Sequence, residues 1–235
     1  MDHSTVLLVD DEQGLLDLLA FTLRKYGIAN IVTATTAKAA MDILLQREIS
    51  LIVLDITLPD GDGFQVCEMM RKHTEAPILF LTAKNQDIHK IKGFELGADD
   101  YITKPFNPAE VAARVQVHLK RMRRIHSLSG PVYDFGYFSV NKKTGQLFVQ
   151  KAETPCAPME FLLLCFLCEH ANFIFTASEL YDKVWKPYQA GDEKTVVIHI
   201  SRLRKKIEPD PGNPRFLVNI KGLGYKLVKK EGNVQ

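Results

Sequence analysis

The sequence lacks the features of a membrane or secreted protein. No apolar run approaches the roughly 18 residues that a membrane-spanning helix requires. The segment before Val6 carries no basic region, and the apolar run that follows is too short for a secretory signal. Only four cysteines occur in 235 residues, so a disulfide scaffold is excluded. We therefore expect a cytoplasmic protein whose thiols are reduced.

The composition that remains is that of an ordinary globular protein. Hydrophobic residues make up 46% and charged residues 25%, with a mean hydropathy of −0.07, which excludes disordered and collagen-like classes. The net charge of +2 conceals a split, because the first 120 residues hold 12 basic and 17 acidic side chains (−5) and the rest hold 18 and 11 (+7). This asymmetry indicates that the second half binds a polyanion, although a basic face can also simply be solvated.

Short apolar runs alternate with helical patterns through the first half. We expect strands at Thr5–Val9, Ile31–Thr33, Leu51–Leu54, Ile78–Leu81 and Tyr101–Thr103. Helical spacing of apolar residues predicts helices at Glu12–Tyr26, Ala37–Arg47, Phe64–Lys72, Asp87–Leu96 and Pro108–Arg121. This alternation predicts an α/β doubly wound fold, in which a five-stranded parallel sheet is covered by helices on both faces.

The second half reads as a separate α+β domain. Strand-like segments at Val132–Val140 and Gln146–Val149 precede helical patterns at Pro158–His170, Ser178–Trp185 and Glu193–Ile207, and a hairpin follows over residues 215–228. We place the first domain at residues 1–121, a linker at 122–131, the second domain at 132–230 and a tail at 231–235.

Chemically distinctive side chains stand at strand ends in the first half. Asp10 and Asp11 follow the first strand and Asp55 ends the third, so a parallel sheet brings their carboxylates to one edge. Acids clustered in this way favour a bound divalent cation with oxygen ligands, such as Mg²⁺. Thr82 and Lys104 add a hydroxyl group and a cation to the same edge. The set predicts a phosphoryl-transfer site in which Asp55 is the nucleophile.

The segments at 9–12, 54–61, 81–83 and 97–106 resemble the receiver domains of two-component response regulators, which have a flavodoxin-like fold. The resemblance implies that a sensor histidine kinase phosphorylates Asp55. It also implies that Mg²⁺ (or Mn²⁺) is bound by Asp10, Asp11, Asp55 and the backbone carbonyl of Thr57. Thr82, Tyr101 and Lys104 would respond to the phosphoryl group, and the Lys104–Pro105 peptide bond would be cis.

The same resemblance implies a homodimer that forms on phosphorylation. By position, Lys90 would pair with Glu110 of the partner subunit and Asp100 with Arg114 of the partner subunit. A third pair would join Glu95 to a basic residue, but Gln116 stands at that position. The alternative is that these are ordinary surface charges, since an exposed ion pair contributes only about 0–1 kcal/mol.

The segment Glu193–Ile207 forms an amphipathic helix with a basic outer face. At 100° per residue, Val196, Ile200, Leu203 and Ile207 fall on one stripe that must face the core. The opposite side collects Lys194, Ile198, Ser201, Arg202 and Lys205. A helix of this kind suits the major groove of DNA, where Arg can read guanine and an apolar side chain can contact the thymine methyl group. A solvated helix is the alternative.

This helix and the segment 221–225 resemble the winged helix-turn-helix domain of the OmpR/PhoB subfamily. The resemblance implies binding of double-stranded promoter DNA at direct repeats, with RNA polymerase as a further candidate partner. The implied DNA-binding residues are Lys194, Thr195, Ile198, Ser201, Arg202, Arg204, Lys205 and Lys221. Val197 and Ser201 depart from the subfamily pattern, so no base preference follows. Ala157 replaces the usual threonine before Pro158 and removes a helix N-cap.

These observations predict a phosphorylation-activated transcription regulator that is not an enzyme, apart from assisting its own phosphorylation and dephosphorylation. One alternative is a constitutive dimer that ignores phosphorylation, and another is an aspartyl-phosphate phosphatase, although Ile56-Thr57 follows Asp55 in place of the second acid that such enzymes use. The pair Cys165 and Cys168 is interpreted as buried core thiols because no ligand cluster with zinc spacing accompanies it.

Overall fold

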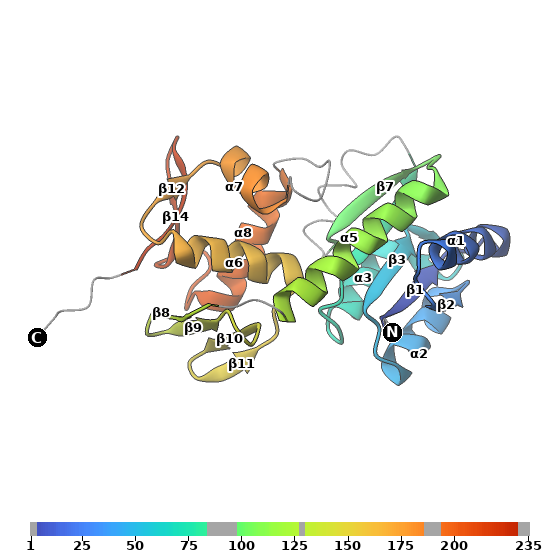
Figure 1. Ribbon diagram of the computed structural model, residues 1–235, viewed down its shortest axis with the longest axis horizontal. Coiled ribbons are helices and arrows are strands. Elements are labelled where there is room, and N and C mark those ends of the chain that lie inside the picture. Colours follow the sequence, from blue (N-terminus) through green and yellow to red (C-terminus); the bar gives the residue numbers. More distant parts are fainter. Residues whose placement is uncertain (1–3, 84–97, 127–129, 186–193, 230–235) are drawn as a thin grey trace, which may run out of the picture. The chain divides into compact units, whose positions relative to one another are not determined.

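The computed structural model describes residues 4–83, 98–126, 130–185 and 194–229. The chain divides into two compact units, Met1–Arg121 and Met122–Gln235 (Figure 1). The helix expected at Asp87–Leu96 lies outside the described residues. Among the helices within the described ranges, none is both long and apolar enough to cross a membrane.

The first unit is built on a five-stranded parallel sheet. Its strands are β1 (Thr5–Val9), β2 (Asn30–Ala34), β3 (Leu51–Asp55), β6 (Ile78–Ala83) and β7 (Asp100–Lys104), in the order β2-β1-β3-β6-β7. The predicted fold class is confirmed. The chain reverses its winding direction between β1 and β3, and ligands bind at the carboxyl ends of strands on either side of such a switch point.

Helices flank this sheet because alternate strand residues point to opposite faces. The helices are α1 (Gln13–Lys25), α2 (Ala37–Gln46), α3 (Gly63–Met70) and α5 (Pro108–His126), and β4 (Thr57–Leu58) pairs with β5 (Gly61–Asp62) in a small hairpin. Buried side chains of α2 and α3 pack on one face, against strand residues that include Leu7, Leu54 and Phe80. Strand residues of the other parity, such as Leu8 and Val53, are equally buried, as α1 and α5 require on the opposite face.

A buried ion pair joins the amino ends of β6 and of the edge strand β7. Arg71, at the end of α3, donates to the carboxylate of Asp99 at 2.6 Å and to the carbonyl oxygens of Thr74 and Ala76. The same carboxylate accepts the N–H of Ile78 at 2.8 Å. Asp99 immediately precedes β7 and Ile78 begins β6. The amino ends of both strands are therefore joined to one another and to α3.

Within its described residues, the second unit combines two small antiparallel sheets with three helices. The first sheet contains β8 (Val132–Asp134), β9 (Phe138–Asn141), β10 (Gln146–Val149) and β11 (Ala152–Thr154). The helices are α6 (Pro158–Glu169), α7 (Ala177–Val184) and α8 (Lys194–Ile207), and the second sheet contains β12 (Ile174–Phe175), β14 (Gly224–Leu227) and β13 (Leu217–Ile220), in that order. The helices and both sheets enclose one core, with Trp185 fully buried in it. The winged helix-turn-helix arrangement is confirmed.

Several elements differ from the sequence-based expectations. The segment expected as one strand at 132–140 is two strands, because the chain turns at Gly136 with a φ of +78°. Helix α5 continues to His126, so the first part of the predicted linker is helical. The strands β4, β5, β11 and β12 were not predicted, since each has only two or three residues and no apolar alternation.

The helix ends of the second unit show how local sequence sets the fold. The hydroxyl oxygen of Thr176 accepts the N–H of Glu179 at the start of α7, and the Glu179 carboxylate accepts the N–H of Thr176. At the start of α6, Ala157 provides no such side-chain cap, as expected. In the hairpin that follows α8, Gly224 has a φ of +129°, and a Cβ atom there would lie 2.1 Å from the carbonyl oxygen of Phe175. Only glycine fits this close approach between β14 and β12.

Candidate functional site

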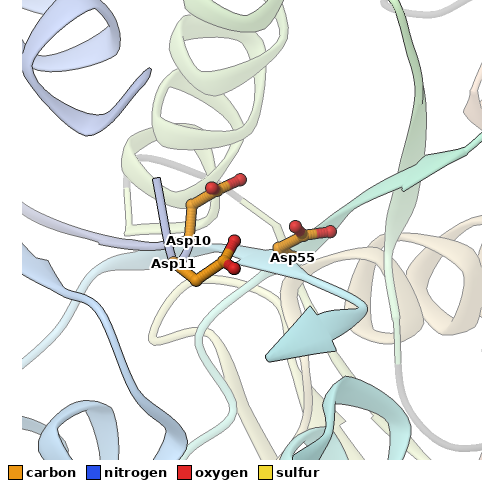
Figure 2. A group of neighbouring side chains, drawn as sticks. All are labelled: Asp10, Asp11 and Asp55. Atoms are coloured by element: carbon orange, nitrogen blue, oxygen red, sulfur yellow. The ribbon is translucent and has the colours of Figure 1, made fainter. Parts of the chain in front are cut away.

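Three carboxylates meet at the carboxyl edge of the parallel sheet. Asp10 directly follows β1, Asp11 comes next, and Asp55 is the last residue of β3. One oxygen from each lies within 4.8 Å of the others (Figure 2). Asp10 and Asp55 are buried, with 1% and 5% of their surface exposed, whereas Asp11 is exposed. The cluster therefore has a closed side formed by the sheet and an open side at Asp11.

A lysine from a third strand joins this cluster. The Lys104 Nζ atom, at the end of β7, donates to Asp10 Oδ2 and to Asp55 Oδ2 at 2.8 Å each. The Lys104–Pro105 peptide bond is cis, as predicted. One ammonium group thus faces two buried carboxylates, and the structure brings together the residues that the sequence placed at the ends of three separate strands.

The acidity of these groups reflects burial and mutual charge. Burial raises the pKa of Asp55 above its ordinary value and the negative charge of Asp10 raises it further, while the Lys104 ammonium and the Thr57 N–H oppose the shift. Burial alone would lower the pKa of Lys104, but its hydrogen bonds and charge attraction to Asp10 and Asp55 outweigh this and raise the pKa. One positive charge does not fully compensate the buried negative charge, which favours an additional cation.

Backbone groups fix the direction of the two buried carboxylates. The N–H of Glu12 donates to Asp10 Oδ1 at 2.9 Å, and the N–H of Thr57 points to Asp55 Oδ1 at 3.4 Å. The first residue of α3, Gly63, packs directly on the strand end, since a Cβ atom there would lie 2.5 Å from the carbonyl oxygen of Asp55. The chain around Asp55 is therefore held by close backbone packing as well as by hydrogen bonds.

The residues present fit a hard divalent cation. Carboxylate oxygens and no thiol or imidazole group form the described cluster, and oxygen ligands are those that Mg²⁺ prefers. The exposed carboxylate of Asp11 gives a cation and its bound water access to the buried pair. The site therefore suits Mg²⁺, which Asp10, Asp11 and Asp55 would hold.

The remaining predicted residues of this site lie on adjacent strands. Thr82 stands in β6 with 4% of its surface exposed, and Thr57 begins β4 with an exposed side chain. Tyr101 in β7 is half-buried, and its ring centroid lies 5.4 Å from that of Phe80. Thr82 is thus next to the strand that carries Asp55, while Tyr101 lies one strand further along the sheet.

Those charged residues expected at a dimer interface that the structure describes pair within the chain. Arg114 Nη1 donates to both carboxylate oxygens of Asp100, at 3.1 and 3.0 Å, and Arg114 also binds Glu110 one helical turn away. Lys90 and Glu95 lie outside the described residues, and Gln116 donates to the carbonyl oxygen of Tyr26. An Asp100–Arg114 contact across a dimer stays a prediction, and it requires exchange of the intrachain pair.

A buried histidine beside this pair was missed by sequence reasoning. His118 is 1% exposed, and its Nε2 atom lies 3.6 Å from Asp100 Oδ2. Burial alone would raise the pKa of Asp100, but His118 and Arg114 outweigh this and hold the pKa below its ordinary value. The available signal was a polar residue at helical spacing from the buried Val111 and Val115.

The predicted recognition helix, α8, shows its core stripe as expected. Val196, Ile200, Leu203 and Ile207 are at most 1% exposed. The exposed side chains include Val197, Ser201 and Lys205, at intervals of one helical turn. Lys221 is exposed in the turn between β13 and β14. A basic, solvent-accessible surface is thus present on α8 and on the adjoining hairpin.

Several predicted DNA contacts on α8 are not exposed. Ile198 is 8% exposed and Thr195 is 5% exposed, which corrects the expectation that Ile198 protrudes. Both share a flank with Arg202, whose guanidinium lies 3.7 Å from the buried Glu160 of α6. The packing of α6 against α8 therefore hides a flank that the helical wheel placed near the outer face. The side chain of Lys194 lies outside the described residues.

Two further bases of α8 are engaged inside the second unit. Lys206 Nζ lies 3.2 Å from Glu160 and donates to the carbonyl oxygen of Pro155. Arg204 Nε donates to the carbonyl oxygen of Leu217 in β13 at 2.8 Å. The predicted phosphate contact by Arg204 would compete with this structural hydrogen bond.

Comparison with known families separates the chain into the same two parts. Residues 6–116 match the family described as response regulator receiver domain. Residues 151–227 match the family described as transcriptional regulatory protein, C terminal. The acidic cluster lies within the first match, and α8 with its hairpin lies within the second.

Relatives resemble this chain over nearly its whole length. The transcriptional regulatory protein YvrH of Bacillus subtilis is 40% identical over 229 residues, which cover 97% of each chain. The sensory transduction protein RegX3 of Mycobacterium tuberculosis is 38% identical, covering 95% of this chain and 99% of its own. The crystal structure of the response regulator DrrB, an OmpR/PhoB homologue of Thermotoga maritima, matches with 31% identity and a TM-score of 0.50 over 96% of this chain and 99% of DrrB.

Proposed function

We infer that Asp55 is the phosphorylated residue of this chain, which belongs to the OmpR/PhoB-type response regulators. The chain is a phosphorylation-dependent DNA-binding transcription regulator, and this is the premise of the inference. The observation that carries the proposal is the position of Asp55 at the switch point of the sheet, where Lys104 and Asp10 lie within one shared hydrogen-bond network. This combination supplies a nucleophile and a cation for phosphoryl oxygens.

The chain's own residues account for the transfer step. A carboxylate oxygen of Asp55 attacks the phosphorus of a phosphohistidine, a P–O bond forms, and the P–N bond to the imidazole breaks as that ring recovers its nitrogen lone pair. The Lys104 ammonium, now 2.8 Å from Asp55, stabilises the phosphoryl oxygens. The hydroxyl of Thr82 at the end of the neighbouring strand donates to one of them. Bound Mg²⁺ supplies further neutralisation of phosphoryl charge at the acidic cluster.

The partners proposed for this cycle follow from the family. The response regulator family implies a histidine kinase as phosphate donor and DNA as the target. We assign homodimerisation through Lys90, Asp100, Glu110 and Arg114 as the step between phosphorylation and DNA binding, with RNA polymerase as a downstream partner. Hydrolysis of the phosphoryl-Asp55 bond, assisted by the same site, would reset the switch.

On the DNA side, the exposed residues of α8 and the hairpin are the proposed contacts. Ser201 and Lys205 face outward from α8, and Lys221 extends from the hairpin. Lysines suit phosphate contacts, and a helix of this size suits the major groove. Arg202 contributes to base reading only after it leaves Glu160.

The test is the intact mass of the full chain after incubation with Mg²⁺ and acetyl phosphate. We expect a single phosphate adduct on the native chain, none on Asp55→Asn, and a normal adduct on Asp42→Asn, which removes an exposed acid of α2. An adduct on Asp55→Asn would assign phosphorylation to another residue. No adduct on the native chain, with normal far-UV circular dichroism and with its kinase also supplied, would favour a constitutive regulator.

A further inference from the structure

The outer stripe of α8 contains an exposed apolar side chain. Val197 is 48% exposed, and it is the only exposed large hydrophobic residue in the described part of this helix. Ser201 and Lys205 follow it at intervals of one turn and are also exposed. The stripe therefore presents methyl groups, a hydroxyl group and an ammonium group in sequence along one side of the helix.

The arginines of α8 do not share this stripe. Arg202 and Lys206 face the buried carboxylate of Glu160, at 3.7 and 3.2 Å. Arg204 donates to the carbonyl oxygen of Leu217. Glu160 and the hairpin therefore hold these three basic side chains on the flanks. Among the side chains that the structure describes, Val197 and Ser201 are the outermost groups toward the amino end of the stripe.

A single exposed valine on a protein surface is common and by itself indicates nothing. Val197 differs because it shares its stripe with Lys205 and lies in the unit that also exposes Lys221, so the surroundings are complementary to a polyanion. In the major groove of duplex DNA, the 5-methyl group of thymine is the one apolar group on the base edges. Contact between the two would remove both from water.

We propose that Val197 reads a thymine 5-methyl group in the major groove, so that this regulator prefers a thymine at a fixed position in each half-site. The inference rests on the proposed function, namely that α8 enters the major groove. The contact replaces the one that the sequence assigned to Ile198, which the structure shows to be buried.

The test uses deoxyuridine, which differs from thymidine only by the missing 5-methyl group. A duplex is first selected from a randomised library with the phosphorylated full chain, and each thymine is then replaced in turn by uracil. We expect one replacement per half-site to weaken binding by about fourfold, the equivalent of one buried methyl group. The same replacement should have no effect on the Val197→Ala chain, whose binding to the original duplex is weakened to a similar extent.

A matched control separates this contact from a general loss of apolar surface. Val132→Ala removes a valine that is 59% exposed in β8, and it should leave the effect of uracil unchanged. If uracil weakens native and Val197→Ala chains equally, another residue reads the methyl group and the inference is wrong. If no position responds to uracil although the selected duplex binds, the inference is also wrong while DNA binding stands. Failure to select or bind any duplex would instead overturn the proposed function of α8.

Discussion

One buried acidic site in each unit of this protein illustrates two opposite uses of a buried carboxylate. In the first unit, Asp10 and Asp55 are buried beside Lys104 and open toward solvent through Asp11, so their charge is accessible to a cation or a phosphoryl group. In the second unit, Glu208 at the end of α8 is 5% exposed, and its oxygens accept three backbone N–H groups of residues 215–217. Burial alone therefore does not identify a reactive acid, because the hydrogen-bond partners decide. Backbone N–H donors occupy the oxygens of Glu208, whereas the acids that share Lys104 can still bind a cation or react.

The largest expected effect on stability comes from the acid of the second unit. Glu208→Ala should lower the free energy of unfolding by about 3 kcal/mol, because it leaves three backbone N–H groups at 215–217, including that of the buried Leu217, without an acceptor. Urea unfolding of the full chain measures this change. Glu153→Ala, which removes an exposed carboxylate in β11, is the control and should change stability little. A small effect of Glu208→Ala would show that Glu208 is not a structural acid and would contradict its contrast with Asp10 and Asp55.

In the first unit, the stability lost on removing the Lys104 ammonium group should depend on whether Mg²⁺ is present. Lys104→Met leaves Asp10 and Asp55 buried without their ammonium partner. In the absence of Mg²⁺, we expect the free energy of unfolding to fall by about 2 kcal/mol. The decrease is smaller than for a fully buried ion pair because 31% of the lysine side chain is exposed. Saturating Mg²⁺ should restore part of this loss. Chemical denaturation with and without Mg²⁺ measures both values, and a loss insensitive to Mg²⁺ would count against a shared site.

Mg²⁺ itself should stabilise only the first unit. At a concentration ten times its dissociation constant, the ion should raise the free energy of unfolding by about 1.4 kcal/mol. Thermal unfolding of the native chain, Asp11→Asn and Asp17→Asn tests this, because Asp11 belongs to the acidic cluster whereas Asp17 is an exposed acid of α1. Stabilisation that survives in Asp11→Asn would place the ion elsewhere.

The smallest expected effects concern helix caps in the second unit. Thr176→Ala should lower the free energy of unfolding by about 1 kcal/mol because it removes the N-cap of α7. Ala157→Ser should raise it by about 0.5 kcal/mol, since a hydroxyl group could then accept an N–H at the uncapped start of α6. Both values come from urea unfolding. Changes of opposite sign would show that local backbone partners contribute to the stability of this unit, as for Glu208.

The sequence predicted the assembly of the acidic cluster well and the exposed face of α8 less well, for a physical reason. Asp55 and Lys104 each end a strand and Asp10 directly follows one, and the geometry of a parallel sheet then decides where their side chains meet. The core stripe of α8 was equally predictable, since it depends only on helical periodicity. The flank that holds Ile198 and Arg202 was not, because its environment is set by Glu160 in another helix.

Other features were beyond a reading of local pattern. His118 stands on the buried stripe of α5, where periodicity predicts an apolar residue, and its partner Asp100 comes from a strand. The role of Glu208 depends on a loop that returns to the end of its own helix. The extension of α5 to His126 also goes beyond the apolar spacing, since its last turns are rich in basic residues.

The ion pair at the amino ends of β6 and β7 has a mechanical consequence for signalling. Arg71 and Asp99 fasten one end of both strands, whereas Thr82 and Lys104 stand at the other end. A strand that is held at one end is displaced most at the end that lies farthest from that attachment. A pull on Thr82 and Lys104 by a phosphoryl group would therefore move the carboxyl ends of these strands most and would leave the base of the sheet at rest.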